Sequence, residues 1–274
     1  MWLLDELVRR LESGDKDTYM VGGVLRLSTI DFPGLPSAVI YCKGCDMRCP
    51  YCHNASLAKG DCVGMPVTHA AKVAERRGLE GVVITGGEPM LDSRVALLIN
   101  LLHRIEGMKV KLDTNGVTMR LVDLASSAGV DADEVSRCLP DYVALDIKLP
   151  TEARYREWGP NLSIGFWSKL ISNIRWVNSN KDGEFRTTVH KSILSMDDLR
   201  IIGKGLLFGR QRPWYLQQFR KCRCPDMRLN DEPTYSDEEL ADMAIELGAY
   251  IRGVDQDTEE RVRFAVEQKT QRHE

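Results

Sequence analysis

The sequence predicts an α/β fold, a partial (β/α)6 TIM-like barrel with a helical and strand extension at its N-terminus. Between residues 38 and 250, short runs rich in Val, Ile, Leu, Tyr and Thr alternate with segments of helical periodicity. Several runs are almost continuously apolar, which is typical of parallel strands buried on both faces. Because parallel strands are joined by right-handed crossovers, we expect the sheet to curl into an open or partial barrel.

Six strands are expected in this alternation, with further elements in front of it. The segment YMVGGVLRLST, residues 19–29, predicts an added strand or hairpin. Ahead of it, apolar residues at helical spacing predict a helix within residues 1–18. The six strands are expected at residues 37–42, 81–85, 109–114, 142–148, 184–190 and 214–219.

Helical segments are expected to connect the strands. The first begins near Thr68 and stops at Gly78. The last begins with a capping box of Ser236 and Glu239 and ends at Gly248. The others follow Asp92 or fall within residues 118–129, 166–180 and 197–207.

The chain is expected to form one main domain. Its 274 residues suffice for one large domain or two small ones, and no linker or repeat divides them. We therefore assign residues 1–18 to a helical extension, 19–254 to the core domain and 255–274 to a charged tail. The tail is expected to be either a short helix or frayed.

The composition excludes several classes of protein. Hydrophobic residues make up 43% and charged residues 28%, as in soluble globular proteins. A net charge of -3 leaves no basic excess for nucleic acid, so we expect no such partner. Since neither a signal peptide nor a run of about 18 apolar residues is found, we expect no membrane association and a cytoplasmic location. In that compartment, clustered cysteines are more typical of metal or catalytic sites than of disulfides.

Four of the eight cysteines lie in YCKGCDMRCPYCHN, residues 41–54. One interpretation is a structural zinc site made of Cys42-x2-Cys45 and Cys49-x2-Cys52, although three residues between the pairs make a tight loop. The other uses three thiolates on one loop to bind three irons of a [4Fe–4S] cluster, which leaves the fourth iron open. In that case Cys42 belongs to the buried end of the first strand.

The pattern C-x3-C-x2-C with an aromatic residue before the last cysteine resembles the signature of the radical SAM superfamily. Here it consists of Cys45, Cys49, Tyr51 and Cys52. The resemblance implies a barrel of the radical SAM type and a [4Fe–4S] cluster on these three cysteines. It also implies that S-adenosylmethionine binds the open iron and is cleaved to a radical that abstracts hydrogen. Tyr51 and His53 are then expected on the adenine side of the site.

Further polar groups follow the next strands, at the edge where ligands bind in such sheets. The segment TGGEP resembles the superfamily segment that meets the methionyl amino group. Gly86 and Gly87 would allow close backbone approach, and Glu88 would accept a hydrogen bond from an ammonium group.

Two aspartates, Asp113 in LDTNG and Asp146 in LDIK, are expected at comparable strand ends, so their like charges would approach each other. A cation or the amino-acid part of the cofactor would relieve this repulsion. Both segments resemble those of activases of glycyl-radical enzymes, where the equivalent residues hold a monovalent cation near the cofactor carboxylate. On that resemblance we add Asn115, Lys148 and Arg186 to the cofactor site. Alternatively, Asn115 is a turn residue, Lys148 is solvated and Arg186 pairs with Asp146.

The resemblance to activases continues through VVITGGEPML, VKLDTNG, DYVALDIKLP and YLQQFR in the same order, from about Gly22 to Val254. It is strongest to activating proteins of anaerobic ribonucleoside-triphosphate reductases. It implies a glycyl-radical enzyme as partner and an electron donor such as flavodoxin or ferredoxin. Docking is expected on the N-terminal helix, residues 54–66 and the region after Phe219.

Alternatives remain open at this level. They are a pyruvate formate-lyase type of activase, a small-molecule radical enzyme such as a deazapurine synthase, and a non-catalytic zinc or iron–sulfur module. Only one cluster is expected, because no further ferredoxin-like cysteine run is present. Cys222 and Cys224 are either without function or a surface thiol pair.

Overall fold

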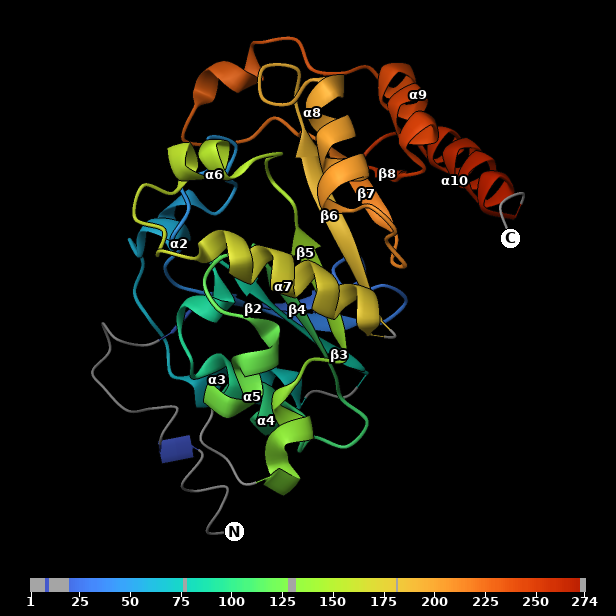
Figure 1. Ribbon diagram of the computed structural model, residues 1–274. Coiled ribbons are helices and arrows are strands. Elements are labelled where there is room, and N and C mark those ends of the chain that lie inside the picture. Colours follow the sequence, from blue (N-terminus) through green and yellow to red (C-terminus); the bar gives the residue numbers. More distant parts are fainter. Residues whose placement is uncertain (1–7, 10–19, 76–77, 128–131, 181, 272–274) are drawn as a thin grey trace.

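The computed structural model describes residues 8–9, 20–75, 78–127, 132–180 and 182–271, and Figure 1 shows the arrangement of its elements. Eight strands form one sheet whose spatial order follows the chain. The first pair is antiparallel and all later pairs are parallel. The strands are β1 Val21–Ser28, β2 Ser37–Cys42, β3 Gly81–Gly86, β4 Lys109–Thr114, β5 Tyr142–Asp146, β6 Gly183–Val189, β7 Trp214–Gln218 and β8 Tyr250–Arg252.

The expected fold class is confirmed, because the six predicted strands are β2 to β7 in the predicted order. The predicted strand at residues 19–29 is β1, which forms a hairpin with β2. β5 ends at Asp146, two residues earlier than expected. β8 was not predicted, because three residues are too short to form a recognisable pattern. The predicted helix within residues 1–18 lies almost entirely outside the described residues.

The helices differ from the expectation mainly at their ends. α3 begins at Val67, next to the expected Thr68, but it ends at Ala74 rather than at Gly78. The charged tail is a 16-residue helix, α10, which packs on α9 and β8. No described helix has an apolar stretch long enough to cross a membrane. The α-helices are α2 Ala55–Lys59, α3 Val67–Ala74, α4 Val95–Leu102, α5 Leu124–Ser127, α6 Glu152–Trp158, α7 Phe166–Ser179, α8 Met196–Ile201, α9 Asp237–Leu247 and α10 Gln256–Gln271.

Shorter helical turns complete the connections. They are η2 Pro89–Leu91, η3 Leu121–Asp123, η4 Ala132–Cys138, η5 Ile202–Leu206 and η6 Met227–Asn230. The capping box predicted for α9 is present: Ser236 accepts from the backbone of Glu239, whose side chain accepts in return. Gly248 ends α9 in the left-handed conformation, as expected.

The two faces of the sheet differ in polarity. Along β4, Val110 and Leu112 are fully buried in the core beneath the helices, and α7 crosses the sheet on this side in Figure 1. The intervening Lys111 and Asp113 point to the opposite, inner face, because successive strand residues alternate. The inner face of the barrel is therefore polar on β4, and this alternation positions the site described next.

Candidate active site

A cavity of ≈ 720 Å³ lies at the carboxyl ends of the strands, and we call it the cysteine-loop cavity. All the residues that the sequence predicted for the cluster and the cofactor line it, so the fold brings them together. They are Cys45, Cys49, Tyr51, Cys52, His53, Gly86, Gly87, Glu88, Asp113, Asn115, Asp146, Lys148 and Arg186.

The loop after β2 presents three free thiols to this cavity, with Cys49 buried and Cys45 and Cys52 half-buried. Arg48 holds the loop by donating to the carbonyl oxygen of Cys45 at 2.6 Å. Burial raises the pKa of Cys45 to about 12 and that of Cys49 to about 11. Deprotonation to thiolates therefore requires a positive charge in the cavity, which bound iron would supply.

The chemistry of the three thiols suits an iron–sulfur cluster, because thiolates are soft ligands. Within the described ranges, no group of three His, Cys, Asp or Glu side chains is arranged to hold a single metal ion. Cys42 is buried in β2 with 2% exposure and does not line the cavity, as the cluster interpretation expects.

Asp46 connects the cysteine loop to β4, and the sequence reasoning missed it. Its Oδ1 accepts from Asn115 Nδ2 at 3.0 Å, and its Oδ2 accepts from the hydroxyl of Thr118. Asn115 Nδ2 also lies 3.8 Å from Cys45 Sγ. In the sequence, Asp46 is simply an acidic residue between two cysteines, and this position does not show that it pairs with the distant Asn115.

The two glycines of TGGEP lie so close to other backbone atoms that a side chain would not fit at either position. Gly86 has a φ of +114°, and a Cβ added there would lie 2.5 Å from the backbone nitrogen of Cys42. A Cβ on Gly87 would lie 1.9 Å from the carbonyl oxygen of Gly44. The expected close backbone approach is therefore made to the segment that leads into the cysteine loop.

Glu88 is 1% exposed and is surrounded by donors from the chain. Its Oε1 accepts from Met90 N at 2.9 Å and Thr114 Oγ1 at 2.6 Å, and its Oε2 accepts from Asn115 N at 2.8 Å. Burial, with the charge of Asp46, raises the pKa of Glu88 to about 7. The carboxyl group thus joins the ends of β3 and β4, and its role toward an ammonium group stays a prediction.

Five charged side chains form a row across the inner face, with Arg186 between the two aspartates. Arg186 Nη1 lies 3.1 Å from Asp113 Oδ2, and its Nε lies 2.8 Å from Asp146 Oδ1. Lys111 pairs with Asp113 at 2.8 Å and Lys148 with Asp146 at 3.1 Å. Burial raises the pKa of Asp146, but the charges of Arg186 and Lys148 outweigh it and set the pKa at about 2. The cations of Lys111, Lys148 and Arg186 therefore offset the repulsion between the two aspartates that the sequence led us to expect.

A second pair missed by the sequence reasoning lies deeper in the barrel. Glu184 is fully buried and accepts from Arg252 Nη1 at 2.8 Å and Nη2 at 2.7 Å. Tyr142 also donates to Glu184, at 2.9 Å. Burial raises the pKa of Glu184, but the hydrogen bonds and charge of Arg252 outweigh it and lower the pKa. A bidentate pair of this kind fixes the arginine side chain.

Tyr51 and His53, the two remaining predicted residues, differ in their exposure. Tyr51 is 8% exposed and packs edge-on against Trp158, with 5.4 Å between the ring centroids, whereas His53 is exposed. The region after Phe219 returns to the cysteine loop, where Asp226 N donates to the carbonyl oxygen of Pro50 at 3.0 Å. In this region Cys222 is half-buried and Cys224 is buried.

Two curated proteins resemble this chain over different shares of its length. A Methanocaldococcus jannaschii protein provisionally named as a glycyl-radical enzyme activating enzyme is 29% identical over 239 residues, which is 86% of this chain and 94% of that protein. The pyruvate formate-lyase-activating enzyme of Streptococcus mutans is 28% identical over 142 residues, 49% of this chain and 52% of that enzyme.

A solved radical SAM methyltransferase from Sphaerobacter thermophilus has the same fold, with a TM-score of 0.58. It is 18% identical, and the likeness covers 85% of this chain and 71% of that one. The family model of the radical SAM superfamily matches residues 39–180, which include the cysteine loop and strands β3 to β5. Since that match spans more than half of the 274 residues, the chain belongs to the radical SAM superfamily.

Proposed function

We propose that this chain is an activase that abstracts hydrogen from a glycine of a partner enzyme, and that the partner is anaerobic ribonucleoside-triphosphate reductase. The observation that carries the proposal is the likeness to the Methanocaldococcus jannaschii protein, which extends over 94% of that protein. The ordered sequence segments shared with reductase activating proteins support this choice of partner, and flavodoxin or ferredoxin is the proposed electron donor.

The residues of the cysteine-loop cavity suit this role. Cys45, Cys49 and Cys52 would hold a [4Fe–4S] cluster, which supplies the electron that cleaves S-adenosylmethionine. The hydrogen bond between Asn115 and Asp46 keeps the loop that carries these thiols against the sheet. Because Cys49 is buried and Cys45 and Cys52 are half-buried, the protein partly shields from water the place where a reactive radical would form.

The charged row provides for the amino-acid part of S-adenosylmethionine. In the proposal, Arg186 and Lys148 attract its carboxylate, and Asp113 and Asp146 hold those two cations in place. Gly86, Gly87, Glu88 and Asn115 form the wall for the amino group, while Tyr51 and His53 line the adenine side. A monovalent cation beside Asp113 and Asp146 is also a prediction. The lysine and arginine side chains already balance the charge of these aspartates, so such a cation is not required for that purpose.

The test uses the protein reconstituted with iron and sulfide without oxygen. The wild type should be brown, should cleave S-adenosylmethionine when reduced, and should produce a glycyl doublet in the EPR spectrum of the added reductase. A silent spectrum with an intact cluster contradicts the proposal.

Two parallel samples separate the alternatives. A doublet only with pyruvate formate-lyase would assign the other partner. Cleavage that is stimulated by a small molecule alone would indicate a small-molecule enzyme. A colourless protein that binds one zinc ion would indicate a module without radical chemistry.

A further inference from the structure

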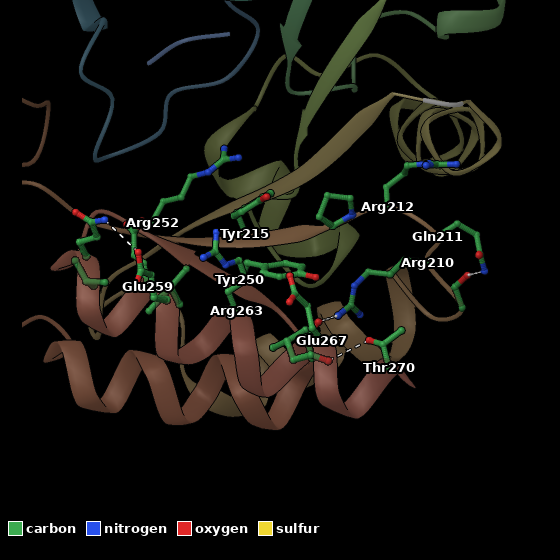
Figure 2. A pocket seen from close by; sticks show the side chains of 18 residues that line it. Arg210, Gln211, Arg212, Tyr215, Tyr250, Arg252, Glu259, Arg263, Glu267 and Thr270 are labelled. Carbon is green, nitrogen blue, oxygen red and sulfur yellow. Dashed lines mark hydrogen bonds between the residues drawn. The ribbon is translucent and has the colours of Figure 1, made fainter. Parts of the chain in front are cut away.

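A second cavity, of ≈ 1050 Å³, adjoins the cysteine-loop cavity. It lies between the inner face of β7 and β8 and the helix α10, and we call it the β8–α10 cavity. Arg252 and Glu259 line both cavities, so the two are neighbours within the open barrel. Figure 2 shows its main side chains, which include Tyr215, Tyr250, Arg252, Arg263, Glu267 and Thr270.

The strand side of this cavity is a fixed aromatic surface. The rings of Tyr215 and Tyr250 lie 5.4 Å apart between centroids, with 34° between their planes. The guanidinium of Arg252 lies 3.5 Å from the centroid of the Tyr215 ring. Because Glu184 fixes Arg252 with two hydrogen bonds, these groups are held in place before any ligand binds.

The helix side carries charges of both signs. Glu259, Arg263 and Glu267 are four residues apart, so they share one face of α10. In Figure 2, Arg263 points from α10 toward the two tyrosines. Neither Arg263 nor Glu267 forms an ion pair within the part of the chain that the structure describes. Both charges are therefore available to a ligand.

The size and charge of the cavity favour a polypeptide as its ligand. Pockets of about 300–1,000 Å³ hold one small molecule, so S-adenosylmethionine needs only the cysteine-loop cavity. A site for a polyanion such as nucleic acid is typically basic throughout, whereas this cavity is lined by both acidic and basic side chains. Aromatic rings, arginine and carboxylates together suit the peptide groups and mixed side chains of an extended polypeptide.

We propose that the β8–α10 cavity binds the polypeptide segment of the partner enzyme that flanks the target glycine. This inference rests on the proposed function, because a glycine reaches the cysteine-loop cavity only if the chain beside it is also accommodated. The flanking segment lies along Tyr215 and Tyr250, and its charged side chains interact with Arg263 and Glu267 of α10. Specificity for the partner thus resides outside the cofactor site.

The test separates binding of the partner from cleavage of the cofactor. Arg263→Glu reverses one charge of the cavity, and Thr270→Trp places a bulky side chain in it. Both variants should reduce the rate of glycyl-radical formation at least tenfold with limiting reductase. Cleavage of S-adenosylmethionine by dithionite without reductase should stay at the wild-type rate. Lys72→Glu, on the exposed side of α3, is the matched control and should change neither rate.

A direct contact supplies an independent readout. A photoreactive benzophenone side chain at position 267 should cross-link to the reductase on irradiation, and the same group at position 72 should not. If the wild type forms the radical while both cavity variants activate normally and position 267 gives no cross-link, this inference is wrong and the proposed function stands. If the wild type forms no radical with an intact cluster, both proposals fail. If Arg263→Glu also loses cleavage without reductase, the rates of Thr270→Trp decide.

Discussion

Asn115, at the end of β4, donates from Nδ2 to Asp46 Oδ1 at 3.0 Å and so ties the cysteine loop to the sheet. The two residues are 69 positions apart in the chain. The loop that carries the candidate cluster ligands is therefore held by the strand end that also carries Asp113. This contact couples the proposed cluster and cofactor sites.

Replacing cysteines separately should distinguish ligands from core residues. Cys45→Ala, Cys49→Ala and Cys52→Ala should each abolish the brown colour and most of the bound iron after reconstitution. Cys42→Ala should retain both and lose about 1 kcal/mol of stability, as is typical of a buried substitution. Iron analysis and visible spectra give the result. Loss of the bound metal in Cys42→Ala as well as in the other three variants would favour the zinc-type pairing of all four thiols.

Arg186 should be the most sensitive member of the charged row. Arg186→Ala leaves Asp113 and Asp146 facing each other without the cation between them. We expect a loss of roughly 3–5 kcal/mol in the free energy of unfolding, which is the usual cost of breaking a buried ion pair. Urea unfolding measures this loss. Arg200→Ala removes an exposed arginine that pairs with Asp197 and Glu246, and its unfolding midpoint should stay close to that of the wild type.

The turn after β3 should not tolerate a side chain at Gly87. Gly87→Ala would place a methyl group 1.9 Å from the carbonyl oxygen of Gly44, so the approach to the cysteine loop must open. We expect destabilisation by about 2 kcal/mol or more and a weakened cluster. At Gly205, an added Cβ meets nothing within 4 Å, so Gly205→Ala should be neutral or stabilising by about 0.4–1 kcal/mol. Thermal melting and cluster content compare the two variants.

The pair of His103 and Asp141 should make stability depend on pH. His103 Nε2 lies 2.9 Å from Asp141 Oδ2, and its Nδ1 lies 2.9 Å from the carbonyl oxygen of Arg137. Burial lowers the pKa of His103, but these two hydrogen bonds outweigh it, so the pKa is raised above 6.5. The charged imidazolium therefore stabilises the fold fully below about pH 6.5, and this contribution is lost as pH rises through the folded pKa.

The test compares urea midpoints at several pH values from 6 upward. The wild type should lose stability over this range relative to His103→Gln, whose side chain does not titrate. His69→Gln, at an exposed position of α3, should keep the wild-type profile. Parallel profiles for the wild type and His103→Gln would contradict the assignment.

Much of the fold followed from local patterns. The bounds of β2 and β4 agree with the predicted residues 37–42 and 109–114, because continuous apolar runs bounded by turns are properties of short segments. The capping box of α9 was found for the same reason. β8 was missed because its three residues depend on pairing with β7, which no short segment reveals.

The predicted site residues could be found from the sequence, because strand order places every strand end at one edge of a parallel sheet. How their charges are balanced could be seen only in the folded structure. Arg186 and Asp113 are 73 positions apart in the chain, and Arg252 and Glu184 are 68 positions apart. No short segment of the sequence contains both members of either pair, so neither pair could be predicted from local patterns. The β8–α10 cavity likewise exists only because α10 folds back beside β8. Periodicity and spacing are local, whereas ion pairs and cavities depend on where distant segments meet.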